Sequence, residues 1–135
     1  MTNIGIYIGR FQPLHYGHIS IINEGLKKED FMIIIIGSKN KKNDRNPFSY
    51  DIRKNFITEY FGDKNYFVEG LDDYDDDYMW IKNLEEIINQ IILNNNFFNC
   101  HLKLYCPMKD ENTKKYLDYV IKTSFIKEYQ DCNLI

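Results

Sequence analysis

The stretch IGIYIGRFQPLHYGH, residues 4–18, decides the fold. Its first third, Ile4–Ile8, is a short apolar run typical of a buried strand, and a turn with Gly and Pro follows it. His15 and His18 then lie three positions apart where a helical pattern begins, so they share one face of the first helical turn. Because the free amides and the dipole of such a turn favour anions, the stretch predicts a strand–turn–helix unit that binds phosphate.

Apolar runs alternate with segments of helical period along the rest of the chain. We expect strands at Ile4–Ile8, Phe31–Gly37, Tyr66–Gly70, Cys100–Cys106 and Ser124–Tyr129. We expect helices at Tyr16–Lys28, Tyr50–Phe61, Met79–Asn95 and Glu111–Tyr119. This order predicts an α/β fold, a Rossmann-like doubly wound and mainly parallel five-stranded sheet with helices on both faces. Ligands of such sheets lie beyond the carboxyl ends of the strands, where the two histidines fall.

Three of these segments carry finer predictions. The second strand is apolar at every position, which is typical of a parallel strand that is covered on both faces. The third helix should bury one stripe of aliphatic side chains, formed by Ile81, Leu84, Ile88 and Ile91. In the fourth strand, period-two alternation places Cys100 and Cys106 on the buried face and His101 on the opposite one.

Composition limits the class of protein. The 135 residues are 44% hydrophobic and 16% aromatic, which favours one folded domain with a real core. A net charge of −3 gives no reason to expect a nucleic-acid or membrane surface. With no apolar run of membrane-spanning length and no signal-peptide layout, we expect a cytoplasmic protein. The three cysteines lack CxxC-type spacing, so we expect reduced structural thiols and no protein-held metal site.

The decapeptide GRFQPLHYGH, residues 9–18, resembles the signature of the HxGH nucleotidyltransferase superfamily. Within that superfamily it is similar to the nicotinamide mononucleotide (NMN) adenylyltransferases of the archaeal and NadM type. The resemblance implies transfer of AMP from ATP to NMN, which gives NAD and pyrophosphate in NAD biosynthesis. It implies that Arg10, His15 and His18 are catalytic. It also implies that ATP and its phosphates are bound by Gly9, Arg10, Phe11, His15, Gly17 and His18.

A second motif, RNPFSYDIR at residues 45–53, is similar to the family's R-[DN]-P-F-[ST]-x-x-x-R signature. The resemblance implies that Arg45 reaches the nucleotide phosphates. The competing interpretation is a solvated basic loop in which Ser49 caps the following helix. For Arg53 two roles stay open: the family pattern retains it, and a structural role on the helix surface explains it equally well.

A third motif, LDDYDDDYMWI at residues 71–81, resembles the family loop that precedes a tryptophan at the start of a helix. The resemblance implies that Asp73 lies near NMN and that Trp80 stacks on the nicotinamide ring. The alternative for Trp80 is packing in the core under the loop, and the other aspartates read as a solvated acidic loop. Mg²⁺ would be bound mainly through the ATP phosphates.

The C-terminal third departs from the family. Lys109-Asp110 with Tyr116-Leu117 resembles a family stretch after the fourth strand, although Asp110 could simply cap the next helix. After the last strand, relatives carry a helix start whose Ser/Thr and Arg bind ATP phosphates, and here the sequence runs DCNLI, residues 131–135. We therefore expect a nucleotidyltransferase domain over residues 1–135 without that motif after Ile135.

Three functions remain open at this point. The first is NMN adenylyltransferase, with ATP and NMN as substrates, no nucleic-acid or membrane partner, and the homo-oligomeric state that the resemblance implies. The second keeps the chemistry with another acceptor, as in phosphopantetheine or cytidylyl transfer, and Arg10-Phe11-Gln12 and the Asp73/Trp80 loop argue against it. The third is a nucleotide-binding module with little catalysis, in line with the missing final motif.

Overall fold

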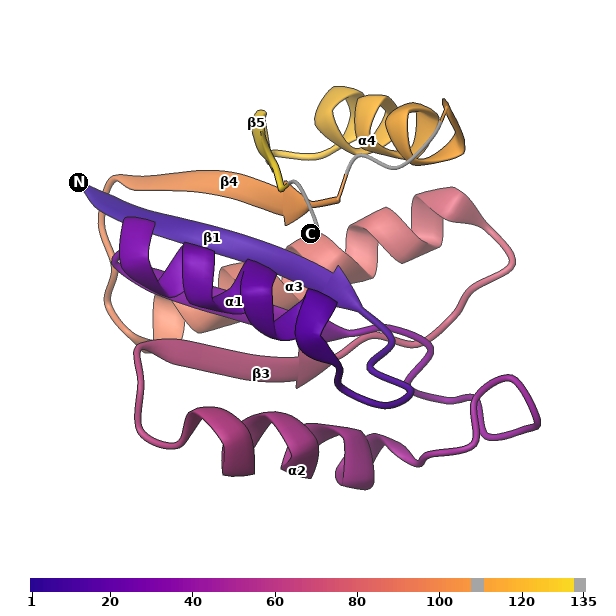
Figure 1. The fold of residues 1–135 in the computed structure, drawn as a ribbon. Coiled ribbons are helices and arrows are strands. Elements are labelled where there is room, and N and C mark those ends of the chain that lie inside the picture. Colours follow the sequence, from indigo (N-terminus) through magenta and orange to yellow (C-terminus); the bar gives the residue numbers. More distant parts are fainter. Residues whose placement is uncertain (108–110, 133–135) are drawn as a thin grey trace.

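Five strands and four helices alternate along the chain in a computed structural model that describes residues 1–107 and 111–132 (Figure 1). The elements are β1 (Thr2–Gly9), α1 (Tyr16–Lys28), β2 (Phe31–Ile36), α2 (Tyr50–Phe61), β3 (Tyr66–Gly70), α3 (Asp77–Asn94), β4 (Cys100–Cys106), α4 (Glu111–Thr123) and β5 (Glu128–Asp131).

The strands form one sheet in the order β3-β2-β1-β4-β5, and all four pairings are parallel. This confirms the predicted doubly wound α/β fold. The chain builds the sheet outward from β1 through β2 to β3 and then crosses back to add β4 on the other side of β1. The strand order therefore reverses between β1 and β4, which is the position where open α/β sheets bind ligands. The loops that leave the carboxyl ends of β1, β2 and β3 gather at the right of Figure 1.

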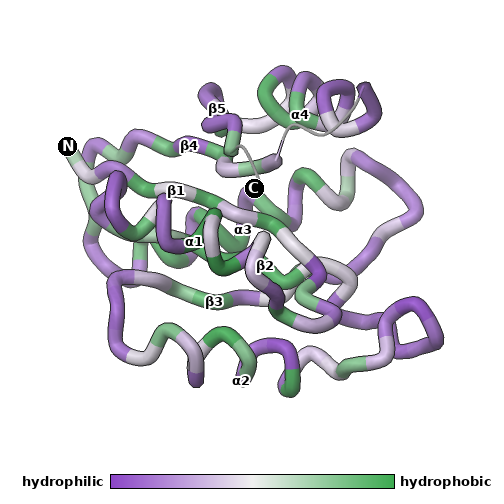
Figure 2. Tube along the Cα trace, in the orientation of Figure 1, coloured by the Kyte–Doolittle hydropathy of each residue, from purple (hydrophilic) through white to green (hydrophobic). Residues whose placement is uncertain are grey.

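Each face of the sheet is covered by two helices. Helices α1 and α2 bury one apolar cluster, and α3 and α4 bury another on the opposite face. Strand β2 contributes side chains to both clusters. Ile33 and Ile35 belong to the α3/α4 cluster, whereas Ile34 and Ile36 belong to the α1/α2 cluster. Its uninterrupted apolar character, visible as the green β2 of Figure 2, is thus explained by burial on both sides. The predicted stripe of α3 is confirmed, since all four of its residues are buried.

Several helices and strands begin or end at other residues than predicted. Helix α3 begins at Asp77, two residues before the predicted Met79, because the Asp76 side chain caps it by accepting a hydrogen bond from the Tyr78 amide at 2.9 Å. Helix α4 continues to Thr123 rather than ending at Tyr119.

The last strand is Glu128–Asp131, not Ser124–Tyr129. Ser124 and Ile126 belong to the turn after α4, where the Ser124 hydroxyl accepts a hydrogen bond from the Ile126 amide at 3.0 Å. Ile126 is fully buried in that turn. Its apolar character therefore reflects packing of the turn and does not mark a strand.

Cys100, Cys106 and His101 lie where alternation predicted. Cys100 and Cys106 face the α3/α4 cluster, and all three cysteines are free thiols. Burial, with smaller effects from Cys132 and Asp131, raises the pKa of the Cys106 thiol to about 12, so this thiol is protonated at neutral pH. His101 lies on the other face, with Nε2 at 2.7 Å from the Glu128 carboxylate.

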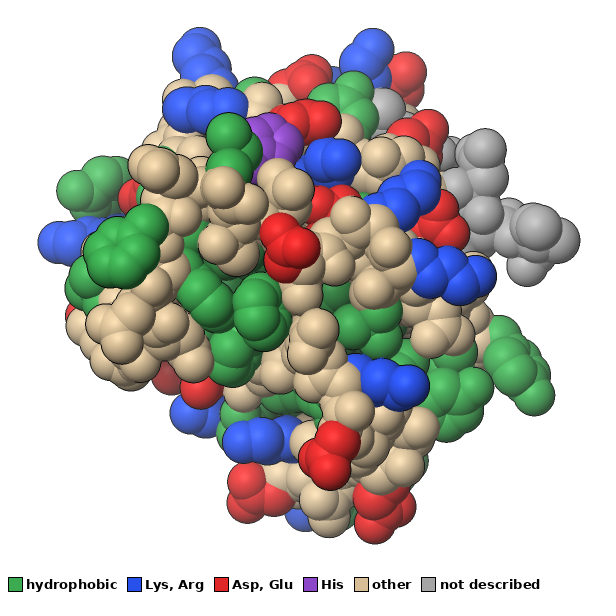
Figure 3. All heavy atoms as spheres, turned by 90° about the vertical axis from the view of Figure 1, so that its left-hand side faces the viewer, with side chains coloured by type: hydrophobic (Ala, Val, Ile, Leu, Met, Phe, Trp, Pro, Cys, Tyr) green, Lys and Arg blue, Asp and Glu red, His purple; other side chains and the backbone are tan. Residues whose placement is uncertain are grey.

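The surface at the amino ends of the strands is shown in Figure 3, where acidic and basic side chains are interspersed. No helix in the described part of the chain has the length and apolar character needed to cross a membrane.

Candidate active site

Two histidines build the start of α1. The Nδ1 atom of His15 accepts a hydrogen bond from the Gly17 amide at 3.0 Å, and the Nδ1 atom of His18 accepts one from the His15 amide at 3.2 Å. Together they form a reciprocal capping box in which His15 is the N-cap. The motif therefore has a local structural reason, because its side chains occupy the places that Ser and Glu usually take.

This cap also fixes the chemistry of the two rings. A neutral imidazole that accepts at Nδ1 carries its proton on Nε2, so both rings are held as Nε2–H donors. The rings stack with centroids 3.7 Å apart, which confirms that His15 and His18 share one face. Both lie at the carboxyl end of β1, beside the point where the strand order reverses. The pair is thus suited to donate hydrogen bonds to phosphate oxygens.

The turn between β1 and α1 buries one of two neighbouring side chains and leaves the other exposed. Phe11 has a positive φ of 53°, and its ring is 1% exposed and lies 4.6 Å from the His18 ring. A Cβ at Gly9 would lie 3.0 Å from the Phe11 ring, so the glycine makes room for it. Arg10 remains exposed. The sequence predicted Phe11 as a nucleotide contact, and in the structure its ring packs beneath the histidines.

Gln12 joins the first motif to the second. Its side-chain amide donates to the Phe48 carbonyl at 3.2 Å and accepts from the Phe48 amide at 2.9 Å. This pairing places the loop that carries Arg45 beside the β1–α1 turn. In that loop the Asn43 side chain accepts hydrogen bonds from the amides of Arg45 and Asn46 at 3.0 and 3.1 Å. The Arg45 side chain is exposed at the end of the folded loop.

Substitution of Gln12 by alanine should therefore weaken the contact between the two motifs. The change leaves both backbone groups of Phe48 without these partners, and we expect the free energy of unfolding to fall by about 1–3 kcal/mol. Urea denaturation would measure it. Gln90→Ala, an exposed glutamine of α3, is the matched control and should change the free energy of unfolding by less than about 0.5 kcal/mol. Equal effects of the two substitutions would contradict the proposed link.

Helix α2 contributes a cap and a buried arginine. Ser49 is its N-cap, as the competing interpretation of this motif had it, and its hydroxyl accepts from the Ile52 amide at 3.4 Å. Arg53 is 0% exposed, so of the two roles left open for it, the one on the helix surface was wrong. Hydropathy gives no hint of this, because arginine is almost never fully buried.

Asp73 is tied to the loop after β2. It accepts a hydrogen bond from the Ser38 hydroxyl at 2.9 Å, and its amide donates to the Asn40 side chain at 3.0 Å. Asp73 is itself exposed, so its carboxylate lies at the surface next to the residues that hold it. The sequence did not single out Ser38 and Asn40, since small polar residues after a strand are common in loops without a site.

Trp80 lies in the first turn of α3 and is half-buried. Its ring meets that of Tyr116 edge-on with centroids 5.8 Å apart, and it packs against the α3/α4 cluster. Trp80 therefore packs against the core, as the alternative interpretation has it, while part of its side chain remains accessible to solvent. The predicted resemblance at Lys109-Asp110 falls outside the described residues, as do the last three residues, 133–135, where the family's final motif was noted as missing.

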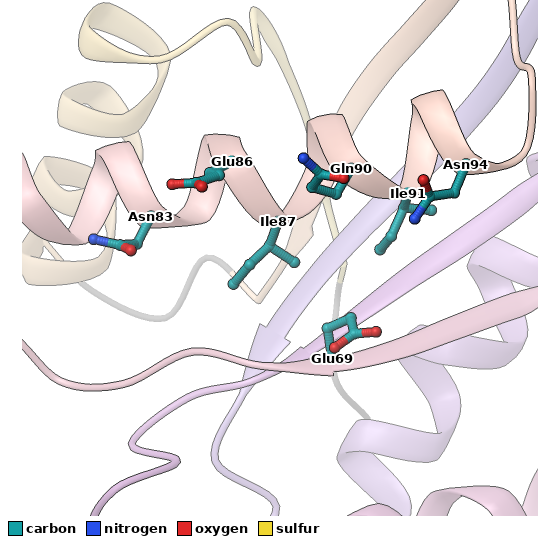
Figure 4. A pocket seen from close by; sticks show the side chains of 7 residues that line it. All are labelled: Glu69, Asn83, Glu86, Ile87, Gln90, Ile91 and Asn94. Carbon is teal, nitrogen blue, oxygen red and sulfur yellow. The ribbon is translucent and has the colours of Figure 1, made fainter.

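One groove of the surface lies away from these motifs. It has a volume of about 380 Å³ and runs between β3 and α3, where Figure 4 shows its polar lining. The lining residues are Glu69, Asn83, Glu86, Ile87, Gln90, Ile91 and Asn94, and none belongs to a motif. Within residues 1–107 and 111–132, no three His, Cys, Asp or Glu side chains are grouped so that they could hold a metal ion. The motifs instead contact one another in the loops at the carboxyl ends of β1, β2 and β3, which we take as the candidate site.

Comparison with known proteins gives consistent results. A family model described as cytidylyltransferase-like matches residues 6–135. The chain is 31% identical over 113 residues to a nicotinamide/nicotinic acid mononucleotide adenylyltransferase of Acinetobacter baylyi, which covers 80% of this chain and 57% of the relative. It is 36% identical over 83 residues to a nicotinamide-nucleotide adenylyltransferase of Methanococcus maripaludis, which covers 59% of this chain and 48% of the relative. The chain spans about half the length of these two relatives.

A solved structure is similar over almost the whole chain. It is that of a bifunctional NMN adenylyltransferase/ADP ribose pyrophosphatase from Francisella tularensis, complexed with AMP and a Mn ion. The TM-score is 0.79 at 26% identity, and the match covers 98% of this chain and 37% of the other.

Proposed function

The chain belongs to the cytidylyltransferase-like family, and on that premise we propose that it transfers AMP from ATP to NMN, giving NAD and pyrophosphate. The observation that carries the proposal is the pair of stacked, helix-capping histidines at the carboxyl end of β1, with both rings held as Nε2–H donors. The names of the curated relatives, nicotinamide-nucleotide adenylyltransferases, support the choice of NMN as acceptor.

In this reaction a phosphate oxygen of NMN attacks the α-phosphorus of ATP and pyrophosphate leaves, so no protein nucleophile is needed. The protein instead aligns two anions and neutralises the charge that grows on the transferred group. We assign hydrogen bonding to the phosphates to His15 and His18. We assign charge neutralisation to Arg10 and Arg45, whose side chains are exposed on adjacent loops joined by Gln12. Backbone approach of the nucleotide at Gly9 and Gly17 completes the assignment.

A divalent ion belongs to this proposal. Mg²⁺ prefers phosphate oxygens and water, so it would be carried by the ATP triphosphate and would neutralise part of its charge. The Mn ion and AMP in the Francisella tularensis structure support a nucleotide-bound metal.

We assign recognition of NMN to Asp73 and Trp80. Asp73→Asn should raise the KM for NMN by about 10- to 100-fold, because a charge-assisted hydrogen bond contributes roughly 1.5–3 kcal/mol, and the KM for ATP should change little. The asparagine can still accept from the Ser38 hydroxyl, so the loop is retained. Initial-rate kinetics with each substrate varied would measure both constants. Asp75→Asn, in the same exposed loop, is the control, and an equal effect of both changes would contradict the assignment.

The proposed function is tested by incubating the chain with NMN, ATP and Mg²⁺ and separating NAD and pyrophosphate by chromatography. If the source gene continues past Ile135, the extended chain should be assayed in parallel. Formation of NAD by either protein supports the proposal. Products only with CTP, or only with a phosphopantetheine acceptor, would replace it by another transferase, and ATP binding without any product would replace it by a binding module. We further propose a cytoplasmic homo-oligomer, which light scattering and cell fractionation would test.

A further inference from the structure

Arg53 makes the most unusual set of contacts in the described part of the chain. Its guanidinium is 0% exposed and donates to backbone carbonyls of three separate segments. Nη1 donates to Gly37 at 2.8 Å and to Arg10 at 3.1 Å, and Nη2 donates to Ser38 at 3.0 Å. Nε donates to Ser49 at 3.3 Å, on the preceding turn of its own helix. One side chain of α2 therefore holds the ends of β1 and β2 together.

Burial of this charge is energetically unfavourable. All four acceptors are neutral carbonyls, and among the described residues no carboxylate forms an ion pair with Arg53. Burial, reinforced by the nearby Arg10 charge, lowers the pKa of Arg53, and Asp73 acts in the opposite direction. An arginine nevertheless stays protonated in proteins. An uncompensated buried charge strongly destabilises a fold unless its hydrogen bonds are complete. Core packing alone would favour an apolar side chain here.

The contacts of Arg53 lead directly to the proposed site. The Arg10 carbonyl belongs to the residue whose side chain we assign to the phosphates. Ser38, which has a positive φ of 51°, holds the Asp73 carboxylate through its hydroxyl. A non-glycine residue keeps such a backbone conformation only when its surroundings fix it. Arg53 supplies one of the bonds that fix it.

We propose that Arg53 is a positioning residue for the adenylyl transfer. By clamping the carbonyls of Arg10, Gly37 and Ser38, it sets the directions in which the Arg10 side chain and the Asp73 carboxylate face the two substrates. The inference rests on the proposed function. An arginine is required because its planar fork spans several acceptors at once, whereas the compact ammonium of lysine cannot reproduce that geometry.

The test compares Arg53→Lys and Arg53→Met with the control Lys54→Met, which removes an exposed charge from the next position of α2. In folded Arg53→Lys, kcat should fall by about 100-fold, since misplacing a reacting group by about 1 Å has an effect of that order. The KM values for ATP and NMN should change less than kcat, and Lys54→Met should retain wild-type kinetics. A merely structural role predicts an unchanged kcat per folded molecule, so that result in either folded variant overturns the proposal.

Hydrogen exchange and the NAD assay of the wild type make every outcome decisive. If neither variant folds, hydrogen exchange of the wild type decides. The Gly37 and Lys39 amides, in the loop after β2 that Arg53 binds, donate to the Gly9 and Leu71 carbonyls, so slow exchange of both without nucleotide supports prearranged loops, and fast exchange overturns the proposal. If neither the wild-type chain nor the chain extended past Ile135 makes NAD, the proposed function fails and this inference fails with it. An active wild type with an equally active Arg53→Lys overturns the inference alone.

Discussion

Replacement of His18 by alanine should lower kcat for NAD formation by roughly 1,000-fold while the chain still folds. The Nε2–H donor lost in this variant is the one that we assign to the phosphate oxygens as their charge grows. The same change removes the acceptor of the His15 amide, so the free energy of unfolding should fall by about 1 kcal/mol. Steady-state kinetics and urea denaturation on the same preparation measure the two effects.

A second substitution separates catalysis from helix capping. Glutamine is a common residue at this position of a capping box, so His18→Gln can accept from the His15 amide and should recover most of the stability. It lacks the imidazole and should remain as inactive as the alanine variant. His101→Ala, far from the site on β4, controls for loss of a histidine and should keep wild-type kinetics. Near-wild-type turnover by His18→Ala would refute the mechanism.

Replacement of His15 by alanine should lower both activity and stability. His15 is the N-cap of α1, and loss of an N-cap typically lowers the free energy of unfolding by about 1 kcal/mol. Its ring also stacks on that of His18, so removal frees the second histidine as well as removing one donor. We therefore expect kcat to fall by about 100- to 1,000-fold in the same assay.

Asparagine at position 15 is the matched variant, because it is among the best N-cap residues. His15→Asn should unfold close to the wild type in urea and still turn over as slowly as His15→Ala. If His15→Asn instead regained activity, the role of His15 would be limited to capping the helix, and the phosphate contacts would have to be reassigned to His18 and Arg10.

Sequence reasoning reached the fold because the strongest signals are local. The six apolar residues of β2 and the stripe on α3 are repetitive, and both are explained by burial on the faces of the sheet. The ends of α4 and β5 could not be located in this way. Ile126 is as apolar as a strand residue, and only the completed fold shows that it fills the space beneath a turn.

The site was predictable in part for the same reason. His15 and His18 belong to one contiguous motif, and their shared face follows from helical geometry alone. Contacts between the motifs could not be predicted from the sequence, because their partners lie far apart along the chain. Gln12 is hydrogen-bonded to Phe48 across 36 positions, and Arg53 to Arg10 across 43. No local pattern records which polar side chains pair across such separations. For this reason a surface role remained open for Arg53, although its side chain is buried and bonded to the loops after β1 and β2.

The two-sided burial of β2 has a consequence before the chain is folded. Four consecutive isoleucines within six apolar residues form a segment of the kind that stacks into cross-β aggregates when it is exposed. Charged residues flank it on both sides, with Lys27, Lys28, Glu29 and Asp30 before it and Lys39, Lys41 and Lys42 after it. Such flanking charges act as gatekeepers, since bringing two copies together in register would crowd like charges. We therefore expect the basic loop beside the proposed phosphate site to oppose self-association of the unfolded chain.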